Sequence, residues 1–144
     1  MSDTQPDILI IESDQVLCDL VQLCLEQQNY QVAVAHNGEE ALTVFQAASH
    51  RHKPKIILMD LFLNQTNALA LIRQIKELPK EEEATIIVLS SFGYREVIQQ
   101  AMEAGAKDFI LKPINTDVLI DRVKKVFEQS YKPKISKPDF PRIF

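Results

Sequence analysis

The chain has 144 residues, which suits a single domain, and a chain of this size can bury roughly 70% of the surface that it exposes when unfolded. Its net charge of −4 gives no reason to expect direct contact with nucleic acid or with an anionic membrane surface. No apolar stretch approaches the roughly 20 residues that a membrane-spanning helix needs, and "MSDTQPD" is no signal peptide, so we expect a cytoplasmic protein.

Short apolar runs alternate along the chain with segments of helical periodicity. The runs that we predict to be strands cover residues 7–12, 31–36, 55–60, 85–90 and 107–111. The runs "ILII", "IILM" and "IIVL" are apolar throughout, which is typical of parallel strands covered on both faces. Repeated βα units of this kind predict a doubly wound α/β domain with helices on both sides of one sheet.

Each predicted strand is followed by a segment whose apolar residues recur at helical spacing. In the first of these helices we expect Val16, Leu20, Leu23 and Cys24 to face the core. The core-facing residues expected in the other four are Ala41, Phe45 and Ala48; Ala68, Ile72 and Ile75; Val97, Ala101 and Ala104; and Leu119, Val123, Val126 and Phe127.

The helical pattern stops after Gln129, and the proline-rich segment "SYKPKISKPDFPRIF" completes the chain. Proline disfavours helix, so this segment should be extended in part. We therefore expect one domain over residues 1–130 and an extended C-terminal tail or linker over residues 131–144.

Polar residues stand where the predicted strands end. Glu12 closes the first strand, Asp60 the third and Ser90 the fourth, and Lys112 follows the fifth. Because the carboxyl ends of parallel strands open on one edge of a sheet, we expect these four side chains to converge there. A carboxylate that closes a buried strand is costly to desolvate, so Asp60 needs a cation nearby, for which Lys112 and a divalent metal ion are the candidates.

Four segments, "ILIIESD", "PKIILMDLFL", "TIIVLSS" and "GAKDFILKP", in this order and at these distances, resemble the receiver domain of two-component response regulators. The resemblance is to the chemotaxis-type single-domain form and covers residue 7 to about residue 129. It implies a flavodoxin-like (βα)5 fold with strand order 2-1-3-4-5. It also implies that Asp60 accepts a phosphoryl group from a histidine kinase or a phosphotransfer protein, and that a downstream protein or output domain reads the result.

The resemblance assigns roles to several other residues. Lys112, followed by Pro113 in a peptide that is often cis in the family, would pair with the phosphoryl group, and Ser90 would hydrogen-bond it. Ser90 and Phe109 match the two switch positions, which shift the surface made by the fourth helix, fifth strand and fifth helix. Phe109 takes the place of a tyrosine that is common in the family.

One departure from the family concerns the metal site. The family places two adjacent acids after the first strand to hold Mg²⁺, whereas this chain has Glu12 and Ser13. A neutral hydroxyl is a poor replacement for a carboxylate on Mg²⁺. The implied ligands are Glu12, Asp60 and the backbone carbonyl of Phe62, with Ser13 in place of the usual acid, so Mg²⁺ binding should be weak. Asp14 is expected to cap the next helix, and its alternative role is that of a displaced ligand.

A second departure is a pair of aromatic rings, Phe62 and Phe92, two residues beyond Asp60 and Ser90. Family members use these positions to tune how readily water attacks the aspartyl phosphate. The rings would either crowd the approach of water and prolong the life of the phosphoprotein, or lie on the surface without such a role.

Two functions remain open from the sequence. The first is a phosphorylation-driven signalling module, and the second is a pseudo-receiver that binds partners independently of phosphorylation, which Ser13 favours. Any catalysis would be phosphorylation and dephosphorylation of Asp60 itself. An enzyme of the haloacid dehalogenase type would need a second acid where Phe62 stands, so turnover of a separate substrate is not expected.

Overall fold

A computed structural model describes residues 6–47, 53–63, 66–79 and 83–128, so the tail expected over residues 131–144 lies outside the described part. Five strands and five helices alternate within these ranges: β1 (Ile8–Ile11), α1 (Gln15–Glu26), β2 (Val32–Ala35), α2 (Gly38–Ala47), β3 (Ile56–Asp60), α3 (Ala68–Lys76), β4 (Thr85–Ser90), α4 (Arg95–Ala104), β5 (Asp108–Leu111) and α5 (Thr116–Phe127). Each predicted strand agrees with the observed one to within a residue at either end.

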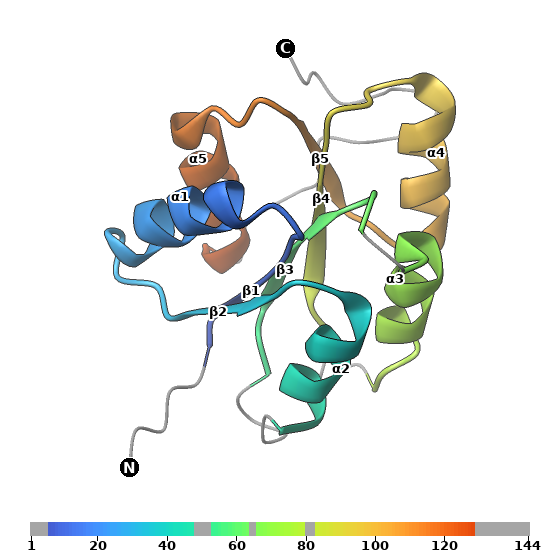
Figure 1. The fold of residues 1–144 in the computed structure, drawn as a ribbon, viewed down its shortest axis with the longest axis horizontal. Helices are drawn as coiled ribbons and strands as arrows, with labels where there is room; N and C mark the ends of the chain where they lie inside the picture. Colours follow the sequence, from blue (N-terminus) through green and yellow to red (C-terminus); the bar gives the residue numbers. More distant parts are fainter. Residues whose placement is uncertain (1–5, 48–52, 64–65, 80–82, 129–144) are drawn as a thin grey trace.

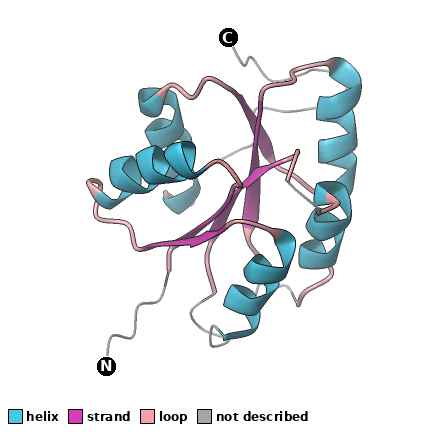
Figure 2. Cartoon of the chain, viewed as in Figure 1, coloured by secondary structure: helices cyan, strands magenta, loops and turns pink. Residues whose placement is uncertain are grey.

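The strands form one parallel sheet in the order β2-β1-β3-β4-β5, which confirms the predicted doubly wound fold. Helices α1 and α5 cover one face of the sheet, and α2, α3 and α4 cover the other (Figures 1 and 2). None of the described helices combines the length and the apolar character required to cross a membrane.

Burial on both faces explains why the strands are apolar throughout. Successive side chains of a strand point to opposite faces. In β1, Leu9 and Ile11 enter the cluster under α2, α3 and α4, whereas Ile8 and Ile10 enter the cluster under α1 and α5. All four are inaccessible to solvent, so a polar residue at any of these positions would leave one of the two cores incomplete.

The predicted core face of α1 is wrong. The helix buries Cys18, Val21 and Leu25 against the sheet. The predicted residues face outward instead: Val16, Leu20 and Leu23 are 79%, 43% and 55% exposed, and Cys24 is half-buried. In this rotation the Cys18 thiol donates a hydrogen bond to the backbone carbonyl of Glu12 at the end of β1.

The other helices bury most of the residues that were predicted to face the core. Residues confirmed as buried are Ala41 and Phe45 in α2, Ala68, Ile72 and Ile75 in α3, Ala101 and Ala104 in α4, and Leu119 and Val123 in α5. Val97, Val126 and Phe127 are half-buried at the edges of these clusters, and Ala48 lies outside the described residues.

Candidate functional site

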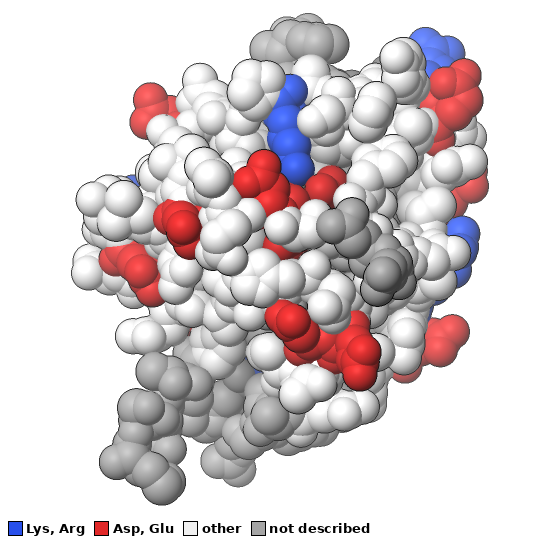
Figure 3. All heavy atoms as spheres, in the orientation of Figure 1, with Lys and Arg blue, Asp and Glu red and all other residues white. Residues whose placement is uncertain are grey.

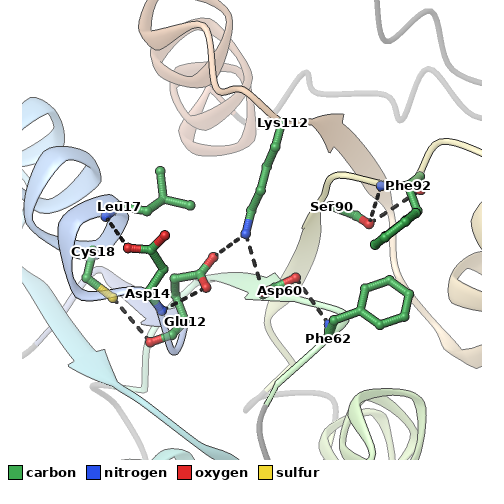
Figure 4. Close-up of polar contacts among 9 residues, drawn as sticks. All are labelled: Glu12, Asp14, Leu17, Cys18, Asp60, Phe62, Ser90, Phe92 and Lys112. Carbon is green, nitrogen blue, oxygen red and sulfur yellow. Dashed lines mark hydrogen bonds and ion pairs between the residues drawn. The ribbon is translucent and has the colours of Figure 1, made fainter.

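The carboxyl edge of the sheet brings together the polar residues that end its strands. Glu12 and Asp60 lie side by side because β1 and β3 are neighbours, with Ile11 in register with Met59. Ser90 ends β4, one position beyond the residue that pairs with Asp60. Figure 4 shows the Lys112 side chain extending from the end of β5 toward both carboxylates. The predicted convergence is therefore observed for Glu12, Asp60 and Lys112, while the Ser90 hydroxyl lies at the same edge with Phe92 as its partner.

The amine of Lys112 bridges the two acids. Its Nζ atom lies 2.7 Å from Oε1 of Glu12 and 3.3 Å from Oδ2 of Asp60. Figure 3 shows a basic side chain bordered by acidic atoms near the middle of this face. The cation expected beside Asp60 is present, but it lies closer to Glu12. Because Glu12 is only 1% exposed, its charge has the greater need of a partner.

Burial and the two neighbouring charges shift the ionisation of this cluster. Burial raises the pKa of Glu12 above its ordinary value, and the negative charge of Asp60 adds to the rise, against hydrogen bonds from Lys112 and from the Asp14 amide. Burial alone would lower the pKa of Lys112, but its hydrogen bond to Glu12 and the charge of Asp60 raise it above the ordinary value. Lys112 is consequently a stable ammonium at neutral pH.

Asp60 and Ser90 are each held by the backbone of the loop that follows them. The amide of Phe62 donates to Oδ1 of Asp60 at 3.1 Å, which leaves Oδ2 facing Lys112. The amide of Phe92 donates to the hydroxyl oxygen of Ser90 at 3.0 Å. The two side chains are thus oriented by matching contacts on adjacent strands, and the Ser90 hydroxyl also donates a hydrogen bond to the Phe92 carbonyl at 3.4 Å.

Three exposed aromatic residues lie in the segments that follow Asp60 and Ser90. Phe62 and Phe92 meet edge to face with ring centroids 4.9 Å apart, and Tyr94 stacks on Phe92 at 6.3 Å. The predicted proximity of Phe62 and Phe92 to the site is observed (Figure 4). Tyr94 was missed by the sequence analysis. The signal that could have found it is the cluster of three aromatic residues just beyond two polar strand ends, where apolar burial does not explain them.

The donors available to a metal ion are fewer than the family pattern requires. Asp14 is the N-cap of α1, with its carboxylate accepting from the Leu17 amide at 3.2 Å, which confirms the predicted capping role. The remaining oxygen donors are the carboxylates of Glu12 and Asp60 and the carbonyl of Phe62. Mg²⁺ prefers hard oxygen ligands of this type, but the set contains one carboxylate fewer than the family pattern. Among the described residues, no cluster of three or more His, Cys, Asp or Glu could hold a metal ion.

Two further residues predicted from the family lie close behind this edge. Phe109 is completely buried in β5, in register with Val88 of β4, and its ring belongs to the cluster under α2, α3 and α4. The peptide bond between Lys112 and Pro113 is cis, as is common in the family.

Comparison with known proteins gives a consistent result. The sequence model of the response regulator receiver domain matches residues 8–124. An uncharacterized 14.6 kDa protein of Leptolyngbya boryana is 32% identical over 121 residues, which cover 84% of this chain and 89% of that protein. The chemotaxis protein CheY of Bacillus subtilis is 28% identical, with coverages of 82% and 94%. The transcriptional regulatory protein KdpE of Staphylococcus aureus is 34% identical, and the match covers 85% of this chain but half of KdpE.

Solved structures share the fold. A two-component response regulator from Clostridium difficile superimposes with a TM-score of 0.78 at 24% identity, covering 87% of this chain and 98% of that one. A response regulator from Thermotoga maritima gives a TM-score of 0.74 at 31% identity, with coverages of 86% and 98%.

Proposed function

The chain belongs to the response regulator receiver domain family, and from this premise we propose that it accepts a phosphoryl group on Asp60. Receiver domains interact with histidine kinases and downstream effectors, so a histidine kinase or a phosphotransfer protein is the proposed donor. The observation that carries the proposal is the Lys112 ammonium 3.3 Å from the Asp60 carboxylate, at the open edge of the sheet. A positioned cation beside a carboxylate nucleophile is the arrangement that phosphoryl transfer needs.

The proposed reaction transfers the phosphoryl group to Oδ2 or Oδ1 of Asp60. The carboxylate oxygen attacks phosphorus, the bond from phosphorus to the donor atom breaks, and the donor leaves with the electron pair of that bond. Lys112 stabilises the negative charge on the phosphoryl oxygens. Glu12, Asp60 and the carbonyl of Phe62 would hold a Mg²⁺ ion, which adds charge neutralisation when it is bound.

The proposed output is a change in the surface made by α4, β5 and α5. A phosphoryl group on Asp60 offers new acceptor oxygens to the Ser90 hydroxyl, whose hydrogen would then leave the Phe92 carbonyl to which it donates at 3.4 Å. Phe109 lies in β5 beside β4 and belongs to the core beneath α4, so a shift of Ser90 and its loop would change the packing around this ring. A downstream protein or output domain would distinguish the two states of this surface.

Intact mass spectrometry tests the proposal directly. We expect incubation with acetyl phosphate and Mg²⁺ to add the mass of one phosphoryl group to the wild-type chain and nothing to Asp60→Asn. If the wild type gains no mass with acetyl phosphate or phosphoramidate, the proposal fails. The second candidate, a pseudo-receiver acting as a phosphorylation-independent interaction module, would then be preferred, since Ser13 stands where a metal-binding acid is usual.

Ser13→Asp is expected to raise the affinity for Mg²⁺ by about tenfold or more, because it supplies the carboxylate that the donor set lacks. Isothermal titration of the unphosphorylated protein with Mg²⁺ measures the change. Ser13→Asn is the matched control, because it has nearly the same size as aspartate but no charge. Equal affinities in Ser13→Asp and Ser13→Asn would rule out a metal role for this position.

Phe62→Asn is expected to shorten the life of the phosphoprotein by roughly several-fold, because an amide admits water where the ring excludes it. Phe62 is 54% exposed, so the substitution should leave the stability of the fold nearly unchanged. The measurement is the loss of the added mass with time after the donor is removed. Phe62→Leu keeps an apolar side chain and serves as control, and decay of Phe62→Asn at the wild-type rate would contradict the prediction.

A further inference from the structure

Tyr94 occupies a helix start that its residue type does not favour. It is the N-cap residue of α4, and its side chain makes no capping hydrogen bond. The other described helices begin with a capping side chain, namely Asp14 for α1, Asn37 for α2, Asn67 for α3 and Asn115 for α5. Ser, Thr, Asp and Asn are the residues that stabilise this position. The presence of tyrosine is therefore not explained by the formation of α4.

The aromatic contact of Tyr94 is with Phe92. The Tyr94 side chain is 65% exposed, so burial in the core does not account for it either. Its ring stacks on Phe92 with a centroid distance of 6.3 Å and an interplanar angle of 25°. Phe92 in turn meets the Phe62 ring edge to face at 4.9 Å. The three rings form a continuous row, here called the aromatic row, from the start of α4 to the loop after β3.

The aromatic row is attached to the reacting groups through the backbone. The Phe62 amide holds Oδ1 of Asp60, and the Phe92 amide holds the Ser90 hydroxyl. Figure 4 shows the two phenylalanine rings facing each other on one side of Asp60, with Glu12 and Lys112 on the opposite side. On the side of Glu12 and Lys112, water finds charged hydrogen-bonding partners. On the other side, the rings of Phe62 and Phe92 offer water no hydrogen-bonding partner.

We propose that Tyr94 is a positioning residue that holds the Phe62 and Phe92 rings in place and thereby slows hydrolysis of the phosphorylated Asp60. The inference rests on the proposed function and adds the control of its lifetime. In hydrolysis, water attacks phosphorus, the bond between phosphorus and the Asp60 oxygen breaks, and the products are the Asp60 carboxylate and inorganic phosphate, which takes both protons of the water. Hydrolysis therefore requires a water molecule to reach the phosphoryl group.

Loss of the Tyr94 ring acts on water through Phe92. An aromatic pair contributes free energy beyond the area that it buries, and this contribution favours one arrangement of the two rings. Without its stacking partner, the ring of Phe92 is exposed on an additional face, and the side chain populates other rotamers. The edge-to-face contact with Phe62 is then made for a smaller fraction of the time, and water approaches the phosphoryl group more often.

Two substitutions separate positioning from a structural role. Tyr94→Ser removes the ring but introduces a favoured N-cap residue, so α4 should be at least as stable as in the wild type. Tyr94→Phe keeps the ring and leaves the cap as it is. We expect the phosphoprotein to decay about two- to tenfold faster in Tyr94→Ser, the range that corresponds to one aromatic pair, and at the wild-type rate in Tyr94→Phe. Thermal unfolding of the same samples should show no loss of stability in Tyr94→Ser.

The Phe92→Ala background tests the route of the effect. Because Tyr94 acts through Phe92, Tyr94→Ser is expected to add no further acceleration once Phe92 is removed. Wild-type decay in Tyr94→Ser would overturn the inference, as would decay in Tyr94→Phe that matches Tyr94→Ser. A full additional acceleration in the Phe92→Ala background would show that Tyr94 acts by another route and would also overturn it.

Nuclear magnetic resonance of the unphosphorylated protein distinguishes failure of this inference from failure of the proposed function. The ring-proton shifts of Phe62 and Phe92 are expected to move toward solvent-exposed values in Tyr94→Ser and to stay near those of the wild type in Tyr94→Phe. If no variant gains mass with a phosphodonor, the proposed function fails, and these shifts still decide whether Tyr94 positions the two rings. Unchanged shifts in Tyr94→Ser would refute the positioning role by themselves.

Discussion

Replacing Lys112 by methionine is expected to slow phosphorylation of Asp60 by about 100- to 1,000-fold, the loss that follows removal of one preorganised group that stabilises transition-state charge. Methionine has a similar length and fills the same space, but it carries no charge. The ammonium that lies 3.3 Å from Asp60 would be absent when negative charge builds up on the phosphoryl oxygens. The rate of mass gain with acetyl phosphate at saturating Mg²⁺ measures the effect.

Glu12 supplies an independent readout of the same substitution. Its pKa is already raised by burial, and the hydrogen bond from Lys112 is the strongest influence that opposes the rise. In Lys112→Met the pKa of Glu12 is expected to rise further, which carboxyl chemical shifts during a pH titration would follow. Lys112→Arg keeps the charge and should leave the pKa of Glu12 closer to its wild-type value. Wild-type phosphorylation in Lys112→Met, together with a shifted Glu12, would show that the amine serves Glu12 alone.

The strand-end residues of the site could be predicted because two signals in the sequence locate them, namely the end of an apolar run and the polar residue that stands there. The apolar runs fix where β1, β3 and β4 end, and a polar residue buried at such an end needs polar partners. Parallel pairing then brings Glu12, Asp60 and Ser90 to one edge. The closer contact of Lys112 with Glu12 than with Asp60 could not be predicted in the same way, because it depends on how the long side chain lies between two acids from neighbouring strands.

The rotation of α1 was predicted wrongly because the helix is apolar on almost every side. Between residues 16 and 25 only Asp19 and Gln22 are polar, so the search for an apolar stripe had more than one solution. The polar residues do not resolve the choice, because Cys18 and Gln22 lie four positions apart on one face, so the buried stripe borders the polar residues.

The ion pair between Asp108 and Arg122 was, like Tyr94, missed by the sequence analysis. Asp108 opens β5, directly before the apolar residues of this strand, and is inaccessible to solvent, while the Arg122 side chain is 7% exposed on α5. Their atoms Oδ1 and Nη1 lie 2.7 Å apart. A charged residue inside a buried strand requires a partner, but nothing in the sequence says which helix provides it, because the two residues meet only after α5 has packed on the sheet.

Arg122→Met is expected to lower the free energy of unfolding by roughly 3–5 kcal/mol, because it removes the guanidinium group that lies against the buried Asp108 carboxylate. Urea unfolding monitored by circular dichroism measures the loss as a lower midpoint at unchanged slope. Lys125→Met is the matched control on the same helix. It breaks the exposed ion pair with Asp121, which lies at 3.0 Å, and should cost less than about 1 kcal/mol.

The double variant Asp108→Leu with Arg122→Met separates the cost of an unpaired charge from the value of the pair itself. Replacing both members of a buried ion pair by apolar residues is often neutral, whereas removing one leaves the desolvation of the other uncompensated. We therefore expect the double variant to be more stable than Arg122→Met, which a double-mutant cycle would quantify. Asp108 begins β5 and Lys112 follows its other end, so phosphorylation by acetyl phosphate should proceed at the wild-type rate wherever the variant is folded. A double variant as unstable as Arg122→Met would mean that the pair holds α5 to β5 by its own attraction, and a slower reaction in the folded protein would mean that this contact also positions Lys112.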